Sequence, residues 1–365
     1  MLSKILALST TLVLLFFILI SRPSRVTLLP NDPLLADQWS WFVVCADEAW
    51  RSPYHGQGTL VAVIDTGVDY LHPDLDKNIW TNPKEIPLNS IDDDQNGWID
   101  DIHGYDFADD DGDPMDPIGH GTHIAGIIAA ITDNKIGIAG IAPAATIMPI
   151  RIAGEHGCLW QNLESAIQYA TLNDADIICI PIAAASLSWM RPLRRAINEA
   201  YVAGIILVGA AGNEQSVVCF PASYGRVIAV SATKKDGLLA EYSNFGPEIE
   251  FACPGGDEGN QILSTWKQGE YKYAYGTSMA AAHVAGVVAI LHSRAPGLQP
   301  DEVRQTLRKQ SRDQGPKGRD EKYGYGLVVA IPFEFGSAFE NLTVPWQKER
   351  EGIPVSIFKY CCTLL

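Results

Sequence analysis

The chain has 365 residues, of which 47% are hydrophobic, and a formal net charge of −16 at pH 7. A chain of this size can bury a large core and form one α/β domain near the upper limit of single-domain length. The acidic excess excludes nucleic acid as a partner, because no basic surface is available to neutralise phosphates. The cysteines are scattered without zinc-site spacing and do not indicate a disulfide framework.

The N-terminus carries an apolar run, residues 5–20, preceded by Lys4 and followed by Arg22 and Arg25. The run is long for the core of a signal peptide and short for a full membrane span, and it has no polar face that would suit a helix of a globular domain. We therefore expect residues 1–25 to be a signal peptide or a signal anchor. The remaining chain is then secreted, or held at a membrane by residues 5–20 with its folded part outside the cytoplasm.

The first predicted strand is the apolar run 59–64, which ends in Asp65-Thr66-Gly67. A continuous apolar run is typical of a buried parallel strand. A carboxylate at the carboxyl end of such a strand lies where open α/β sheets place their sites. Asp65 is therefore a candidate site residue, with an ordinary turn or helix-capping Asp as the alternative.

An acidic insertion follows over residues 92–113. The pattern D-x-D-x-N-G-x-I-D over residues 92–100 matches the first nine positions of an EF-type calcium loop. His103 stands where that loop has its closing Glu, so two neighbouring acids are expected to replace it. The predicted calcium ligands are Asp92, Asp94, Asn96, Asp100 and Asp101, and the alternative is a solvated acidic loop.

Strands and helices alternate along the middle of the chain. After His120, helices are predicted over residues 121–130, 163–170 and 191–203, and strands over 146–152, 176–182 and 204–209. This alternation indicates βαβ units and a parallel sheet. Neither G-x-G-x-x-G nor a P-loop Lys is present, which argues against a nucleotide-binding protein.

Ser278 begins a further helix, predicted over residues 278–293. A Ser in the first turn of a helix is commonly an N-cap. It can also be a nucleophile whose oxyanion lies near backbone N–H groups. Because Asp65 and His120 precede it, the chain has the order Asp, His, Ser, which is one of the known orders for acyl-transfer chemistry. We therefore favour the nucleophile.

Four sequence blocks together resemble the subtilisin-like serine proteases (subtilases, peptidase S8). They are Asp65-Thr66-Gly67, His120-Gly121-Thr122-His123, Ala210-Ala211-Gly212-Asn213 and Gly276-Thr277-Ser278-Met279-Ala280. The resemblance runs from about Asp32 to Ala330. It implies the subtilisin-like three-layer α/β fold, with a mostly parallel central sheet flanked by helices. It also implies a catalytic domain over residues 26–335 and leaves a C-terminal tail, residues 336–365, of unknown role.

The resemblance implies a serine endopeptidase that binds protein or peptide substrates in extended conformation. Ser278 is then the nucleophile, His120 the general base, and Asp65 the carboxylate that orients the imidazole. The side-chain amide of Asn213 is the oxyanion donor. The residues expected to bind substrate are Ile180, Pro181, Ile182, Ala183, Ala211, Gly212 and Glu214.

The chain departs from the family pattern in three places. Pro181 and Ala183 stand where the substrate-edge motif Asn-x-Ser-x-Gly has Ser and Gly, and Ala282 replaces a Pro after the nucleophile. About a dozen residues separate the apolar run from Asp32, so we expect maturation without the family's propeptide or an unusual gene product. Two alternatives stay open: a catalytically impaired fold that serves as a binding or scaffold protein, and a peptide transferase or cyclase.

The resemblance further implies a structural calcium ion and no catalytic metal. Its ligands would be the side chains of Asp74 and Asn134 and the carbonyls of Thr132, Ile136 and Ile138, with Gln38 or Asp32 completing the shell. The residue types alone would favour an ordinary turn built on Asn and Gly.

Overall fold

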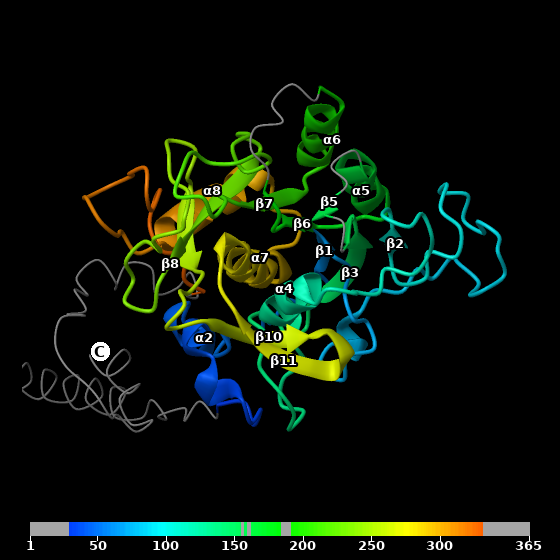
Figure 1. The fold of residues 1–365 in the computed structure, drawn as a ribbon, viewed down its shortest axis with the longest axis horizontal. Coiled ribbons are helices and arrows are strands. Elements are labelled where there is room, and N and C mark those ends of the chain that lie inside the picture. Colours follow the sequence, from blue (N-terminus) through cyan, green and yellow to red (C-terminus); the bar gives the residue numbers. More distant parts are fainter. Residues whose placement is uncertain (1–28, 155–156, 159–161, 184–190, 331–365) are drawn as a thin grey trace, which may run out of the picture.

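A sheet of parallel strands forms the centre of the molecule, in the order β2-β3-β1-β6-β7-β8-β9 (Figure 1). The computed structural model describes residues 29–154, 157–158, 162–183 and 191–330. The predicted N-terminal segment 1–25 and tail 336–365 lie outside these residues. The strands of the sheet are β1 (Leu60–Asp65), β2 (Tyr105–Asp106), β3 (Thr146–Arg151), β6 (Ile177–Ile180), β7 (Ile206–Ala210), β8 (Val227–Thr233) and β9 (Phe251–Pro254).

Alternating side chains of the central strands feed two separate cores. In β1, Val61 and Val63 join the larger core, whereas Ala62 and Ile64 face the other side. Strand β6 repeats the pattern, with Cys179 in the larger core and Ile180 in the second. This two-residue period shows that both faces of the sheet are covered, as expected for a parallel sheet in an α/β protein.

Helices cover the two faces. Helices α4 (His120–Ala129) and α7 (Thr277–Arg294) contribute to the larger core, and α5 (Asn162–Leu172) and α6 (Arg191–Val202) to the second (Figure 1). Helix α7 is buried along its whole length from Thr277 to Ser293, which fits its nearly uniform apolar sequence. The three-layer α/β fold expected from the sequence is thereby confirmed.

The remaining elements surround this centre. They are α2 (Trp39–Val43), α3 (Ala46–Ala49), α8 (Pro300–Gln310), the two-stranded pairs β4 (Ala153–Gly154) with β5 (Gly157–Cys158) and β10 (Ile262–Trp266) with β11 (Glu270–Ala274), and short 3-10 turns at Leu35–Asp37, Asp76–Asn78 and Lys267–Gly269. The β10–β11 hairpin lies over α4, where Ser264 and Thr265 donate hydroxyl hydrogen bonds to the carbonyls of His123 and Thr122.

The predicted elements are present with small shifts at their ends. The predicted strand 176–182 stops at Ile180, one residue before Pro181, which has no N–H to donate to a neighbouring strand. Cys179 and Cys253 are free and fully buried in strands, as small apolar side chains. Within the described residues no helix is both long and apolar enough to cross a membrane, and the apolar run 5–20 lies outside them.

Candidate active site

Asp65 and His120 form the best-defined part of the site. Asp65 is the last residue of β1 and is fully buried, and His120 is the first residue of α4. Nδ1 of His120 lies 2.8 Å from Oδ1 and 2.9 Å from Oδ2 of Asp65. Burial lowers the pKa of the imidazole, but the charge and hydrogen bond of Asp65 outweigh it, so the pKa of His120 is raised above its usual value. The pair therefore fixes which ring nitrogen carries the proton and stabilises the imidazolium.

A second buried carboxylate, Asp116, holds this pair in place. Its Oδ1 accepts hydrogen bonds from the hydroxyl of Thr66, the residue after Asp65, and from the N–H of Gly119, the residue before His120. Its Oδ2 accepts the N–H and the hydroxyl of Thr122 in the first turn of α4. Burial raises the pKa of Asp116 although these donors act in the opposite direction. Asp116 thus ties the end of β1 to the start of α4.

Ser278 lies in the first turn of α7, at the carboxyl end of strand β6. Its hydroxyl donates a hydrogen bond of 2.6 Å to the carbonyl of Pro181. Because β6 pairs with β1 and Pro181 follows β6, this contact places Ser278 at the same edge of the sheet as Asp65. Among the described residues, however, no hydrogen bond joins Nε2 of His120 to Oγ of Ser278. The serine hydroxyl is instead hydrogen-bonded to the backbone carbonyl of Pro181.

Asn213 follows β7 and is oriented by the residue before the serine. Its Oδ1 accepts both the N–H and the hydroxyl of Thr277, each at 2.9 Å. The same hydroxyl accepts the N–H of Gly212 at 3.1 Å. Since both Thr277 donors fall on Oδ1, the Nδ2 amide of the exposed Asn213 remains available to another acceptor.

The predicted substrate-binding residues lie on the two segments beside the serine. Ile180 ends β6, Pro181 is buried, and Ile182 and Ala183 are half-buried. Ala211 and Gly212 are buried after β7. Glu214 is exposed, but its Oε2 accepts hydrogen bonds from the N–H of Asn213 and the side chain of Asn244. The Glu214 carboxylate is therefore turned back onto the loop that carries Asn213.

Comparison with known proteins shows the family to which the chain belongs. Residues 56–326 match the Subtilase family, Peptidase_S8. This chain belongs to the subtilase family.

Two relatives and one solved structure illustrate the relationship. The thermophilic serine proteinase of Bacillus sp. (strain AK1) is 39% identical over 280 residues, covering 76% of this chain and 62% of that protein. The halolysin-like extracellular serine protease Nep of Natrialba magadii is 36% identical over 306 residues, covering 82% of this chain and 52% of that protein. This chain thus spans less than two thirds of either relative. A structure of proteases from Pseudoalteromonas arctica PAMC 21717 superposes with a TM-score of 0.69 at 30% identity, covering 82% of this chain and 97% of that one.

The predicted subtilase calcium ligands lie together in one loop region. Asp74 is fully buried and accepts hydrogen bonds from the side chain of Asn134 at 2.6 Å and from the N–H of Ile138 at 3.0 Å. Asp32, also buried, accepts the N–H groups of Asp133 and Asn134. Gln38 is instead bonded at both ends to the backbone of Ala139.

The backbone of that loop provides unpaired acceptors. Within the part of the chain that the structure describes, the carbonyls of Thr132, Ile136 and Ile138 accept no hydrogen bond. Two buried carboxylates and these carbonyls form an oxygen-rich set of the kind that calcium prefers, and the residues fit such an ion.

The acidic insertion is built differently from the expected EF-type loop. Asp100 accepts the N–H groups of Asn89 and Ser90, and Asp101 accepts the hydroxyl of Tyr169 and the side chain of Asn96. Asp92 and Asp94 instead lie close to Glu85. The calcium assignment of this loop stays a prediction.

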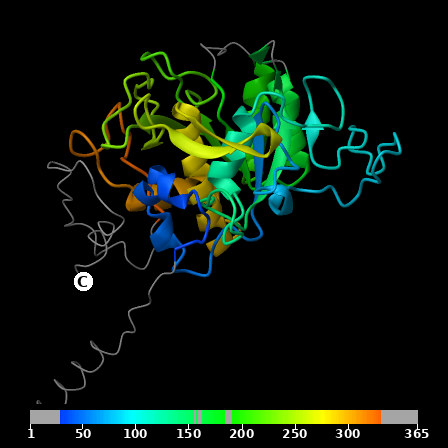
Figure 2. The same cartoon turned by 60° about the horizontal axis from the view of Figure 1, so that its bottom comes forward.

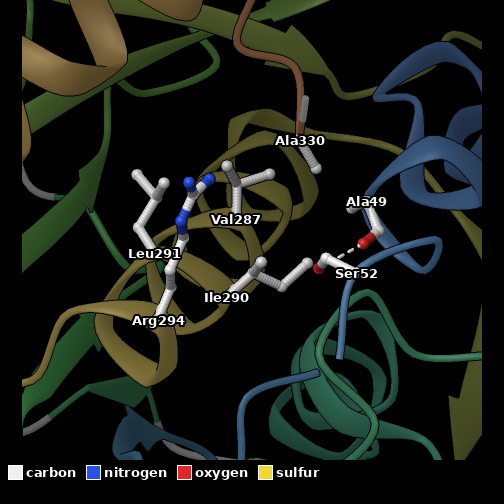
Figure 3. Close-up of a pocket in the computed structure, with 7 residues that line it drawn as sticks. All are labelled: Ala49, Ser52, Val287, Ile290, Leu291, Arg294 and Ala330. Atoms are coloured by element: carbon white, nitrogen blue, oxygen red, sulfur yellow. Dashed lines mark hydrogen bonds between the residues drawn. The ribbon is translucent and has the colours of Figure 1, made fainter. Parts of the chain in front are cut away.

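Sequence reasoning missed the roles of Asp116 and Thr277. Thr277 directly precedes Ser278, and Asp116 lies four residues before His120, but their roles depend on contacts with segments 64 and 50 residues away. A small cavity of about 20 Å³ lies between the C-terminal half of α7, at Val287 and Ile290, and the residues Ala49 and Ala330 (Figure 3). Ser278 is not among the residues that line it.

Proposed function

We propose that this chain is a serine endopeptidase that hydrolyses peptide bonds through an acyl-enzyme. The observation that carries the proposal is the Asp65–His120 pair, held by two short contacts at the sheet edge where Ser278 also lies. Subtilase relatives that are named serine proteases support the same reaction.

Each residue has a defined task in the reaction. Ser278 Oγ attacks the scissile carbonyl while Nε2 of His120 takes its proton, and the imidazolium then gives that proton to the leaving amine. Asp65 accepts from Nδ1 of His120 and stabilises the positive charge. The oxyanion accepts hydrogen bonds from Nδ2 of Asn213 and from the N–H of Ser278.

The substrate is proposed to be an extended peptide lying along residues 180–183 and 211–214. Pro181 has no N–H to donate, but its carbonyl can accept an N–H of the peptide, and Ile182 and Ala183 keep their backbone N–H groups. Oε2 of Glu214 accepts hydrogen bonds from the loop, which holds this carboxylate against the loop and away from the bound peptide.

We also propose a structural calcium ion held by Asp74, Asn134 and the three loop carbonyls, with Asp32 completing the shell. When bound, calcium would neutralise the two buried carboxylates and tie the N-terminal segment to the loop after α4. Binding requires the Asn134 amide to turn its oxygen toward the ion, because its nitrogen now faces Asp74. The ion would stabilise the fold and take no part in the chemistry.

Export from the cytoplasm is proposed from the apolar run 5–20, in agreement with the name of the Natrialba magadii relative as an extracellular protease. Whether residues 1–25 are cleaved or anchor the enzyme follows from the N-terminal sequence of the mature protein, which Edman degradation would give.

A fluorophosphonate probe tests the central proposal, because it phosphonylates only an activated serine. The probe should label the parent chain but not Ser278→Ala. Ser293→Ala, which changes a serine at the far end of α7, is the control and should be labelled like the parent. Cleavage of an internally quenched peptide with both ends blocked then establishes endopeptidase activity. Folded, calcium-loaded protein that neither reacts with the probe nor cleaves the peptide would overturn the proposal.

A further inference from the structure

We propose that Asn244 is a positioning residue for the oxyanion donor, acting on Asn213 through the loop of residues 211–219. This role rests on the proposed peptidase function, because a positioning residue matters only if Asn213 stabilises an oxyanion. Asn244 lies between β8 and β9, whereas the loop connects β7 to β8. These strands lie on the side of the sheet opposite β2 and the acidic insertion, which is drawn in cyan in both views (Figures 1 and 2).

The backbone of the loop is held at its two ends. The N–H of Cys219 donates to the carbonyl of Ala211 at 2.8 Å and closes the loop at its base. The N–H of Asn244 donates to the carbonyl of Gly212 at 2.9 Å and joins the loop to the neighbouring segment. Between these anchors, N–H groups of the loop still need acceptors, since a buried backbone donor without a partner is costly.

The side chain of Asn244 provides those acceptors from inside the loop, where it is fully buried. Its Oδ1 accepts the N–H groups of Glu214 and Ser216, both at 2.9 Å. Its Nδ2 donates to the carbonyl of Ala211 at 3.1 Å and to Oε2 of Glu214 at 2.9 Å. A flipped amide would place its NH2 group against two N–H donors, so the orientation of Asn244 is fixed. Both ends of this amide are thus used to shape the loop.

The Glu214 carboxylate connects Asn244 to Asn213. Oε2 of Glu214 accepts Nδ2 of Asn244 and the N–H of Asn213, each at 2.9 Å. Thr277 holds Oδ1 of Asn213 and so fixes the rotation of its amide. Asn244 and Glu214 fix the backbone that carries this amide. Both constraints are needed, because a displacement of about 1 Å at a reacting group can cost about 10²-fold in rate.

Gly212 shows how closely the Asn244 amide packs against the loop. Its φ is +106°, and a Cβ at this residue would lie 2.3 Å from Nδ2 of Asn244. Any side chain at residue 212 would therefore displace the amide. The residue directly before Asn213 is thus shaped to receive Asn244.

Asn244→Asp tests this role because it is isosteric and keeps both acceptors for the N–H groups of the loop. It replaces the donor by an oxygen that faces Oε2 of Glu214, so two carboxylates share one buried place. For a blocked fluorogenic peptide at about pH 8, kcat should fall about 10–100-fold with KM nearly unchanged, because the oxyanion forms only after attack. In an Asn213→Ala background, the same change should cost less than about 2-fold, since no amide is left to position.

The pH dependence of Asn244→Asp separates positioning from a general loosening of the fold. Among the described residues, the titratable side chains bonded to Asn244 are Glu214 and Cys219. Two adjacent carboxylates retain one proton at a higher pH than a lone carboxyl does, and that proton restores a hydrogen bond between them. The ratio of variant to parent kcat should therefore rise between about pH 8 and about pH 5, with the titration of His120 cancelling in the ratio.

A second substitution should remove this pH dependence. Glu214→Gln combined with Asn244→Asp exchanges the donor and the acceptor, which abolishes the repulsion between two carboxylates. The double variant should recover part of the loss at about pH 8 and give a ratio to the parent that is flat with pH. A ratio for Asn244→Asp alone that is already flat would contradict the proposed role.

Controls distinguish the possible failures. Asn198→Asp changes a half-buried Asn of α6 that bonds to Tyr224, and it should keep the parent kcat and pH profile. Thermal unfolding shows whether each variant is folded at the assay temperature. If Asn244→Asp does not fold, Asn244→Ser, which buries no charge, takes its place and should lower kcat about 3–10-fold with the same dependence on Asn213.

Two outcomes separate this role from the proposed function. An active parent whose kcat is unchanged in the Asn244 variants, or falls equally in the Asn213→Ala background, would overturn the role of Asn244 and leave the peptidase function standing. A folded parent that hydrolyses no peptide would overturn the peptidase function, and the role of Asn244 with it.

Discussion

The orientation of the Asn213 amide provides the sharpest test of the proposed mechanism. Thr277 donates twice to Oδ1 of Asn213, which leaves Nδ2 free to donate to an oxyanion. Asn213→Ala removes this donor while leaving the Asp65–His120 pair untouched. Because the oxyanion exists only after the serine has attacked, the loss should appear in kcat and leave KM nearly unchanged.

The expected loss is about 10²–10³-fold in kcat, since removing one oxyanion donor raises the barrier by about 3–4 kcal/mol in comparable sites. A fluorogenic peptide substrate under saturating conditions gives kcat, and single-turnover acylation shows whether the serine step is affected. Asn213→Asp keeps the acceptor for Thr277 but replaces the donor by a negative oxygen. Its activity should fall at least as far as that of Asn213→Ala.

Thr277 supplies a graded control. Thr277→Val removes the hydroxyl donor but keeps the backbone N–H, so the amide loses one of its two anchors. A single hydrogen bond of this kind contributes about 0.5–1.5 kcal/mol, and kcat should fall by about 2–10-fold. Thr277→Ser should restore it. If Asn213→Ala keeps the parent kcat, or loses activity only through KM, Asn213 is not the oxyanion donor.

Three further outcomes follow from the structure. Asp65→Asn removes the charge that raises the pKa of His120, the proposed general base, so the acidic limb of the kcat/KM profile should move to lower pH while kcat falls by roughly 10⁴-fold. Gly126→Ala should lower the free energy of unfolding by about 1–3 kcal/mol in a urea titration, because its Cβ would lie 2.1 Å from Oγ1 of Thr265. Gly225→Ala, which meets no atom within 4 Å, should leave that free energy nearly unchanged. Chelation of calcium should lower the Tm of the parent, since an ion present at 100 times its Kd stabilises by about 2.7 kcal/mol, and Asp74→Asn should reduce that calcium dependence.

The sequence predicted the parts of the fold that depend on local pattern. Strand β1 ends at Asp65, and strand β7 ends shortly before Asn213. Both were predictable because a strand that is buried on both faces needs a continuous apolar sequence. The ends of these two strands carry residues of the candidate site. Helix α7 was predicted to within one residue at each end for the same reason.

The parts that were missed depend on contacts between distant segments. The β10–β11 hairpin has mixed polarity, and its exposed strand β11 offers little periodic signal, although the turn at Gln268-Gly269 was a usable cue. Asp116 acquires its role only because Thr66, 50 residues earlier in the chain, is folded against it. No spacing rule within the sequence predicts that contact.

The resting contact of Ser278 with Pro181 does not weaken the proposed reaction, and a comparison of energies shows why. Attack requires the hydroxyl to leave the Pro181 carbonyl and turn toward His120, exchanging one neutral hydrogen bond for another. The cost of leaving such a bond is about 0.5–1.5 kcal/mol, or roughly tenfold at most, and it is recovered when the new bond forms. A substrate strand that donates an N–H to the same carbonyl would compete with the serine for that acceptor. Substrate binding would thereby favour the rotamer that reaches the base, so the departure at Pro181 is compatible with an active enzyme.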